Sequence, residues 1–145
     1  MTTRTYGGFW IRVVAAFIDA LIVGIPVVIL TAIAGLLLQT QSVLGVLAAV
    51  AVYLVAFAAG IVYYVYFWSA AGNGQTLGMK ALDLHVLRSD GQRLTAGRAF
   101  GRYCALTLAY STCYIGVIMV AFTERKQGLH DMICDTIVVK ETESV

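Results

Sequence analysis

The sequence predicts an all-α membrane protein. We expect a helical bundle with two long spanning helices, a third segment that spans or is re-entrant, and a small cytoplasmic β-hairpin or strand element. Composition is the first observation, because 60% of the 145 residues are hydrophobic and only 12% are charged. A soluble domain carries about 25% charged residues. The other two observations are that the apolar residues form three long stretches and that the basic residues lie beside them.

The three apolar stretches cover residues 9–38, 43–71 and 103–122. About 20 apolar residues suffice to cross a hydrocarbon core of about 30 Å. The first two stretches exceed that length, so we expect their ends to tilt or to enter the headgroup zone. A polar loop at 72–102 and a tail at 123–145 complete what we expect to be a single membrane domain over residues 1–145.

The third stretch has two open interpretations. Arg98 and Arg102 precede it, and Arg125 and Lys126 follow it, so one straight crossing would leave positive charge on both sides of the membrane. A re-entrant pair of short helices would avoid this. Each arm would then be only about 15 Å long, and the turn at 110–112 would have to lie within protein rather than against lipid.

Two segments have strand character. Residues 136–140 are rich in β-branched side chains, and residues 82–87 alternate apolar and polar side chains before a turn sequence at 89–91. Their pairing requires both segments to lie on one side of the membrane. We therefore expect a cytoplasmic C-terminus if the loop at 72–102 is cytoplasmic.

The basic residues predict that orientation. The connection at 39–42 has no charge, whereas five basic residues lie in the loop: Lys80, Arg88, Arg93, Arg98 and Arg102. By the positive-inside tendency, this predicts a multi-pass protein of the inner (cytoplasmic) membrane with a cytoplasmic N-terminus. The lipid bilayer is the expected partner. Because the net charge is only +2 and the basic residues flank membrane segments, no nucleic-acid partner is expected.

Arg12 and Asp19 lie within or at the edge of the first apolar stretch. A spacing of seven residues is two helical turns, so both side chains project from one face, about 10 Å apart along the axis. A charge at the bilayer centre costs roughly 2.5 to 3.5 kcal/mol, so these two must be paired or solvated. They can form a structural ion pair with each other, or they can belong to a transport site.

Three blocks of sequence resemble a known family. These are residues 8–20 with Arg12 and Asp19, residues 74–80 with Thr76, and residues 129–139 with Asp131 and Asp135. In this order and spacing the chain resembles the RDD family of small bacterial membrane proteins, named for one arginine and two aspartates. The resemblance implies that Arg12 is the arginine and Asp19 the first aspartate. It favours Asp131 as the second, with Asp135 close enough to take that part.

The resemblance implies a transport function, because cation/proton antiport has been associated with the family. Asp19 would then exchange a proton for Na⁺, Li⁺ or K⁺, Arg12 would compete with the cation, and Asp131 and Thr76 would complete an oxygen shell. No internal repeat is visible in the chain. Since transporters usually surround their site with two repeats, we expect an exchanger of this size to be a homo-oligomer.

The alternative is a non-transporting scaffold or accessory protein that binds a partner membrane protein. Its Arg12, Asp19 and Asp131 would form a purely structural network. Catalysis is not expected under either hypothesis, because no spacing typical of a nucleophilic site is present. Cys104, Cys113 and Cys134 suggest no disulfide, and His130 with Cys134 lacks a full set of metal ligands. We expect neither a metal nor a cofactor.

Overall fold

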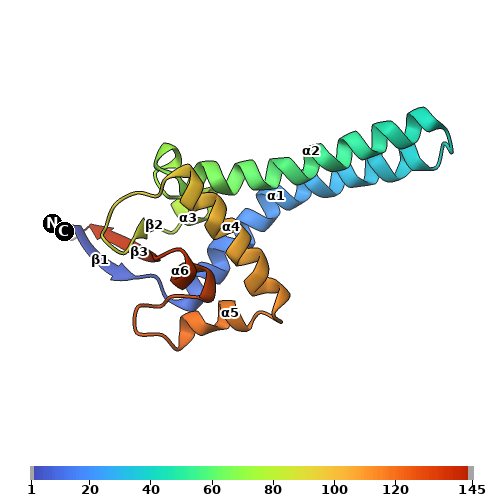
Figure 1. Ribbon diagram of the computed structural model, residues 1–145. Helices are drawn as coiled ribbons and strands as arrows, with labels where there is room; N and C mark the ends of the chain where they lie inside the picture. The colour runs from blue at the N-terminus through green and yellow to red at the C-terminus, as the bar shows by residue number, and fades with distance from the viewer. Residues whose placement is uncertain (1, 144–145) are drawn as a thin grey trace.

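The computed structural model describes residues 2–143; residues 1, 144 and 145 lie outside the described part of the chain. It confirms the predicted fold class, since two long apolar helices are joined to a small three-stranded antiparallel sheet (Figure 1). The elements in chain order are β1 (Thr2–Tyr6), α1 (Phe9–Leu38), α2 (Val43–Trp68), η1 (Ala70–Gly72), α3 (Leu77–Lys80), β2 (Leu84–Arg88), α4 (Ala96–Ser111), α5 (Ile115–Ile118), η2 (Met119–Ala121), α6 (Leu129–Ile133) and β3 (Thr136–Glu143).

Helices α1 and α2 form a long hairpin that projects from the rest of the molecule (Figure 1). Both are long and apolar enough to cross a membrane. Ser42 begins α2 by accepting a hydrogen bond from the Gly45 backbone N–H. The second stretch was expected to continue to residue 71, but α2 ends at Trp68, because the backbone turns at Ser69 into the short helix η1.

Small side chains are buried where α1 and α2 pack, among them Ala34, Gly45, Ala49 and Ala56. Small residues allow membrane helices to approach closely. Because these small residues are buried in contacts within one chain, their presence does not require a second copy of the chain. The homo-oligomer therefore stays a prediction.

The third apolar segment is bent. Helix α4 and the segment Ile115–Ala121 meet at 113°, as in a broken span or a re-entrant loop. The break follows Ser111, within the turn expected at 110–112, and Cys113 and Tyr114 there have positive φ angles of 54° and 63°. Helix α4 also starts earlier than the apolar stretch, at Ala96, because the Thr95 side chain caps it by accepting from the Arg98 N–H.

The sheet has the strand order β1-β3-β2, and both pairs are antiparallel. The predicted pairing of 82–87 with 136–140 is confirmed, with Val86 opposite Val138. Strand β1 was not predicted, because its five residues show no alternation of apolar and polar side chains. Its pairing with β3 brings the two ends of the described chain side by side (Figure 1).

A buried core joins the sheet to the base of the hairpin. Its central side chains come from β2 and β3, and they pack against the start of α1, the end of α2 and the start of α4. The buried members are Ala15, Trp68, Met79, Leu84, Val86, Leu94, Ala99 and Val138. This packing brings the start of α1 close to α4, and α6 packs directly on α4, which positions the charged residues described next.

Candidate functional site: two buried carboxylates

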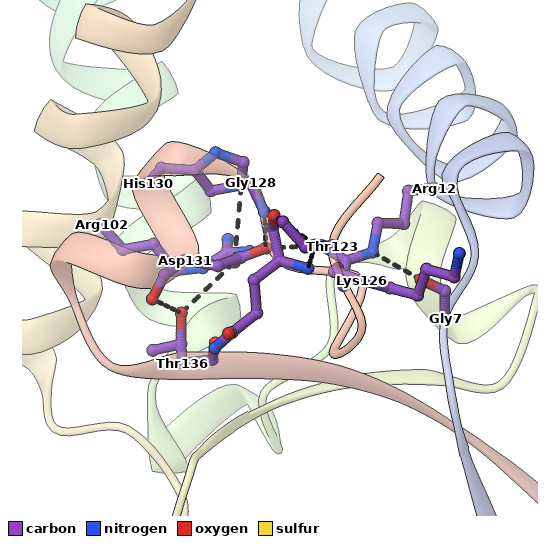
Figure 2. Close-up of polar contacts among 10 residues, drawn as sticks. Gly7, Arg12, Arg102, Thr123, Lys126, Gly128, His130, Asp131 and Thr136 are labelled. Carbon is purple, nitrogen blue, oxygen red and sulfur yellow. Dashed lines mark hydrogen bonds and ion pairs between the residues drawn. The ribbon is translucent and has the colours of Figure 1, made fainter. Parts of the chain in front are cut away.

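Asp131, on α6, lies between two arginines (Figure 2). Its Oδ2 is 2.6 Å from Nη1 of Arg12, and its Oδ1 is 2.6 Å from Nη2 of Arg102. The Asp131 side chain is fully buried, and the arginine side chains are 12% and 3% exposed. Charge-assisted hydrogen bonds of this length are among the strongest in proteins. Asp131 therefore ties α1 and α4 to the C-terminal segment.

Other donors and acceptors complete this cluster. The Gly128 N–H and the Thr136 hydroxyl also donate to the Asp131 carboxylate, at 3.2 Å and 3.3 Å. Arg12 uses its remaining nitrogens on backbone carbonyls, donating to Gly7 at 3.0 Å and to Lys126 at 2.5 Å (Figure 2). Each recorded donor group of Arg12 thus reaches a different part of the chain.

The charges of this cluster set its protonation. Burial alone would raise the pKa of Asp131, but Arg102, His130 and Arg12 together hold the pKa of that carboxyl well below its usual range. For His130 burial dominates and lowers the pKa to about 4. At neutral pH Asp131 is therefore ionised and His130 is neutral, so two guanidinium charges face one carboxylate.

The lowered pKa of His130 predicts acid sensitivity. The folded protein binds fewer protons at this site than the unfolded chain, so the contribution to stability is fully present above pH 6.5 and is lost as the pH falls towards 4. One such group changes the free energy of unfolding by up to about 1.4 kcal/mol per pH unit. Thermal unfolding in detergent should show a Tm that falls over this range, and His130→Gln should make the fall shallower. An unchanged slope in that variant would contradict the assignment.

Asp19 forms a separate cluster with α2 and α3. Its side chain is 3% exposed and accepts three hydrogen bonds. The donors are the Thr76 hydroxyl at 2.5 Å, the Tyr63 hydroxyl at 2.7 Å and the Gly78 N–H at 2.8 Å. Each hydroxyl also accepts from a backbone N–H, Thr76 from Met79 and Tyr63 from Leu77, both at 3.2 Å. The hydroxyl protons are therefore directed at the carboxylate.

Gly78 permits this arrangement because it lets α3 approach α1 closely. A Cβ atom built at Gly78 would lie 2.2 Å from the Ala15 carbonyl oxygen and 3.0 Å from the Asp19 carboxyl carbon. Gly78 lies in α3, within the sequence block at 74–80, and α3 packs directly on α1. Without a side chain at residue 78, its N–H reaches the carboxylate.

The structure thus divides the residues expected to form one network. Arg12 pairs with Asp131 rather than with Asp19, and Thr76 joins Asp19. Asp135 belongs to neither cluster, because it lies exposed in a turn with φ 52° and accepts a hydrogen bond from the Ser89 hydroxyl. Of the two candidate aspartates, the buried partner of Arg12 is Asp131.

Arg102 was not recognised as a site residue from sequence. It was counted among the loop charges that set orientation, but its guanidinium lies 4.2 Å from the centre of the Trp68 ring and pairs with Asp131. One feature of the sequence could have indicated Arg102 as a site residue, because it is the charged residue directly before the apolar stretch that begins at 103. A basic residue there also fits an orientation signal, so only the fold identifies its partner.

Metal-binding potential is low in the part of the chain that the structure describes. No group of three or more His, Cys, Asp or Glu side chains there could hold a metal ion. Cys104, Cys113 and Cys134 are free thiols. His130 faces Asp131 at 3.5 Å instead of sharing a site with Cys134.

Comparisons with known proteins identify a family and two relatives. The model of the RDD family matches residues 6–135. The uncharacterized protein YxaI of Bacillus subtilis (strain 168) is 37% identical over 146 residues, which cover 91% of this chain and 95% of YxaI. The uncharacterized protein RP437 of Rickettsia prowazekii (strain Madrid E) is 35% identical over 81 residues, 54% of this chain and 42% of RP437. No solved structure matches the chain.

Proposed function

The chain belongs to the RDD family of membrane proteins, and from that premise we propose that it is a non-transporting membrane module that acts as a scaffold or accessory to partner membrane proteins. One observation carries this proposal. Both buried carboxylates, Asp19 and Asp131, are held by donors from other elements of the same chain. In this role the buried charges stabilise the arrangement of the helices within the bilayer.

The directions of the hydrogen bonds support a structural role. At Asp19, three neutral groups donate to the carboxylate, so their positive ends occupy the positions that an alkali cation would need. A cation site would require oxygen lone pairs to converge instead. At Asp131, two guanidinium groups occupy the carboxylate and would repel a further cation.

A cation/proton exchanger is the second candidate, and one observation favours it. Asp19 borders a cavity of about 340 Å³, and among the ion pairs recorded for residues 2–143 none involves Asp19. A buried carboxylate without a cationic partner is a common feature of ion pathways in membranes. This hypothesis predicts flux of Na⁺, Li⁺ or K⁺ that Asp19→Asn abolishes while the protein stays folded.

We further place the chain in the inner membrane, multi-pass, with a cytoplasmic N-terminus. The shared sheet supports one common side for β1, β2 and β3, and the basic loop favours the cytoplasm. In a variant without native cysteines, a membrane-impermeant thiol reagent applied to intact cells should label cysteine at Thr40. It should not label cysteine at Ser89 or Lys140. Labelling at Ser89 and Lys140 without labelling at Thr40 would reverse the orientation.

Stability of Asp19 variants tests the structural proposal. Asp19→Asn should lower the free energy of unfolding by about 1–3 kcal/mol, because charge-assisted bonds to buried donors are lost. Tyr63→Phe should also destabilise, since it leaves the carboxylate one donor short. Tyr53→Phe is the matched control, because Tyr53 lies on the same helix and is 41% exposed. Thermal unfolding in detergent measures all three, and a wild-type Tm for Asp19→Asn would argue against the proposal.

A further inference from the structure

The cavity at the base of the hairpin has the size and the lining expected of a site that binds an amphiphilic molecule. Its volume of about 340 Å³ lies in the range of small-molecule sites, roughly 300–1,000 Å³. Side chains from α1, α2, α4 and α5 line it, and most are apolar or aromatic, including Phe9, Val13, Tyr64, Leu106, Tyr110 and Val117. Since these elements belong to the two candidate spans and the bent third segment, we expect lipid molecules to have access to the cavity.

One part of the wall carries polar side chains that lack acceptors. Trp68, Arg102 and His130 all line the cavity and are 4%, 3% and 6% exposed. Within the described residues, Trp68 Nε1, Arg102 Nε and His130 Nδ1 are buried and have no hydrogen-bond partner. The indole and guanidinium nitrogens can only donate. A buried donor without an acceptor costs about 1–3 kcal/mol. Because these three nitrogens are themselves inaccessible to solvent, an oxygen acceptor in the cavity would reach and stabilise them after a shift of the side chains of this wall.

The charges of the wall favour an anion at this end. Arg12 and Arg102 both line the cavity, and Asp131 neutralises only one of the two guanidinium charges. Asp19 also borders the cavity, but it lies two helical turns from Arg12, about 10 Å along α1. The cavity therefore has a basic end beside α6 and α4, and an acidic end farther along the hairpin.

We propose that this cavity binds an acyl chain with an oxyanion head, either the carboxylate of a fatty acid or the phosphate of a lipid. The head lies against Arg102 and Trp68, where donors lack acceptors and positive charge is in excess. The chain lies among the aromatic and aliphatic walls. A neutral ester offers no negative charge to this end, and a cationic amphiphile would be repelled by it. This inference goes beyond the scaffold proposal and does not depend on the role of Asp19.

Fluorescence of Trp68 tests the proposal directly. The chain has two tryptophans, and Trp10 is 77% exposed, so Trp10→Phe leaves Trp68 as the sole reporter in the cavity wall. The purified protein in nanodiscs is titrated with a brominated fatty acid, brominated phosphatidic acid, the methyl ester of the same fatty acid, and a brominated alkylamine. Bromine quenches tryptophan on contact. Saturable quenching by the fatty acid, the phosphatidic acid or both, at concentrations where ester and amine have no saturable effect, supports the proposal and identifies the head.

A matched pair of variants separates the cavity from the surrounding lipid. Ala16 borders the cavity and is exposed, so Ala16→Phe should narrow it without disturbing the core; Ala20, also exposed and one turn farther along α1, lies outside the lining. Ala16→Phe should weaken binding about tenfold or more, whereas Ala20→Phe should not. Equal quenching by acid and ester, or equal affinities of the two variants, would overturn the proposal. Neither outcome bears on the stability of Asp19 variants, so the two proposals fail separately.

Discussion

Asp131→Asn should lower the free energy of unfolding by about 3–5 kcal/mol, the cost typical of removing one partner from a buried ion pair. An amide cannot balance the charges of Arg12 and Arg102, and its N–H₂ group would face donors where the carboxylate accepts four hydrogen bonds. Thermal unfolding in detergent should show a Tm lowered by several degrees or no cooperative transition. Arg102→Met in the same chain should recover part of the loss.

Asp135→Asn is the matched control for this change. Asp135 lies four residues farther along the chain, is exposed, and accepts from the Ser89 hydroxyl. Its substitution should change the free energy of unfolding by no more than about 0.5 kcal/mol, as for most surface positions. Equal stability of the Asp131→Asn and Asp135→Asn proteins would show that the buried cluster does not hold the fold.

Gly78→Ala should also destabilise the protein, by about 1–3 kcal/mol or more, although alanine favours helices by about 1 kcal/mol over glycine. The added Cβ would lie 2.2 Å from the Ala15 carbonyl oxygen, and backbone atoms cannot move aside as a flexible side chain can. Helix α3 must therefore move away from α1, which removes the Gly78 N–H from Asp19. The readout is the Tm in detergent.

Gly97→Ala controls for helix propensity alone. Gly97 lies in the first turn of α4, and a Cβ there would meet nothing within 4 Å. This variant should be as stable as the wild type or slightly more stable. If Gly78→Ala behaved in the same way, the close packing of α3 on α1 would be contradicted.

Much of the fold could be predicted from the sequence, because its signals are local. Hydropathy over 20 to 30 residues defines the two spans, and β-branched residues at 136–140 define β3. Strand β1 was missed because its sequence, TTRTY, gains strand structure only through its partner β3. The bend after Ser111 was open from sequence, since the segment is long enough for one crossing, whereas the basic residues on both sides of it favour a return.

In the candidate site, local sequence signals predict which residues share a helix face but not which residues they contact. The spacing of Arg12 and Asp19 predicts one helix face, and both do border one cavity. Their partners come from segments 57 and 119 residues away, Thr76 and Asp131, and the spacing of Arg12 and Asp19 does not predict them. Arg102 was missed for the same reason. Which charge pairs with which is decided by the packing of α4 and α6 against the hairpin.

Ion flux is the most direct test of whether these buried charges hold the fold or carry ions. The purified chain is reconstituted in proteoliposomes, insertion and folding are verified, and uptake of Na⁺, Li⁺ and K⁺ is followed under an imposed pH gradient. The structural account predicts no uptake above that of protein-free liposomes, together with a lowered Tm for Asp19→Asn. Proton-coupled uptake by the wild-type chain, abolished in an Asp19→Asn protein that keeps the wild-type Tm, would contradict it.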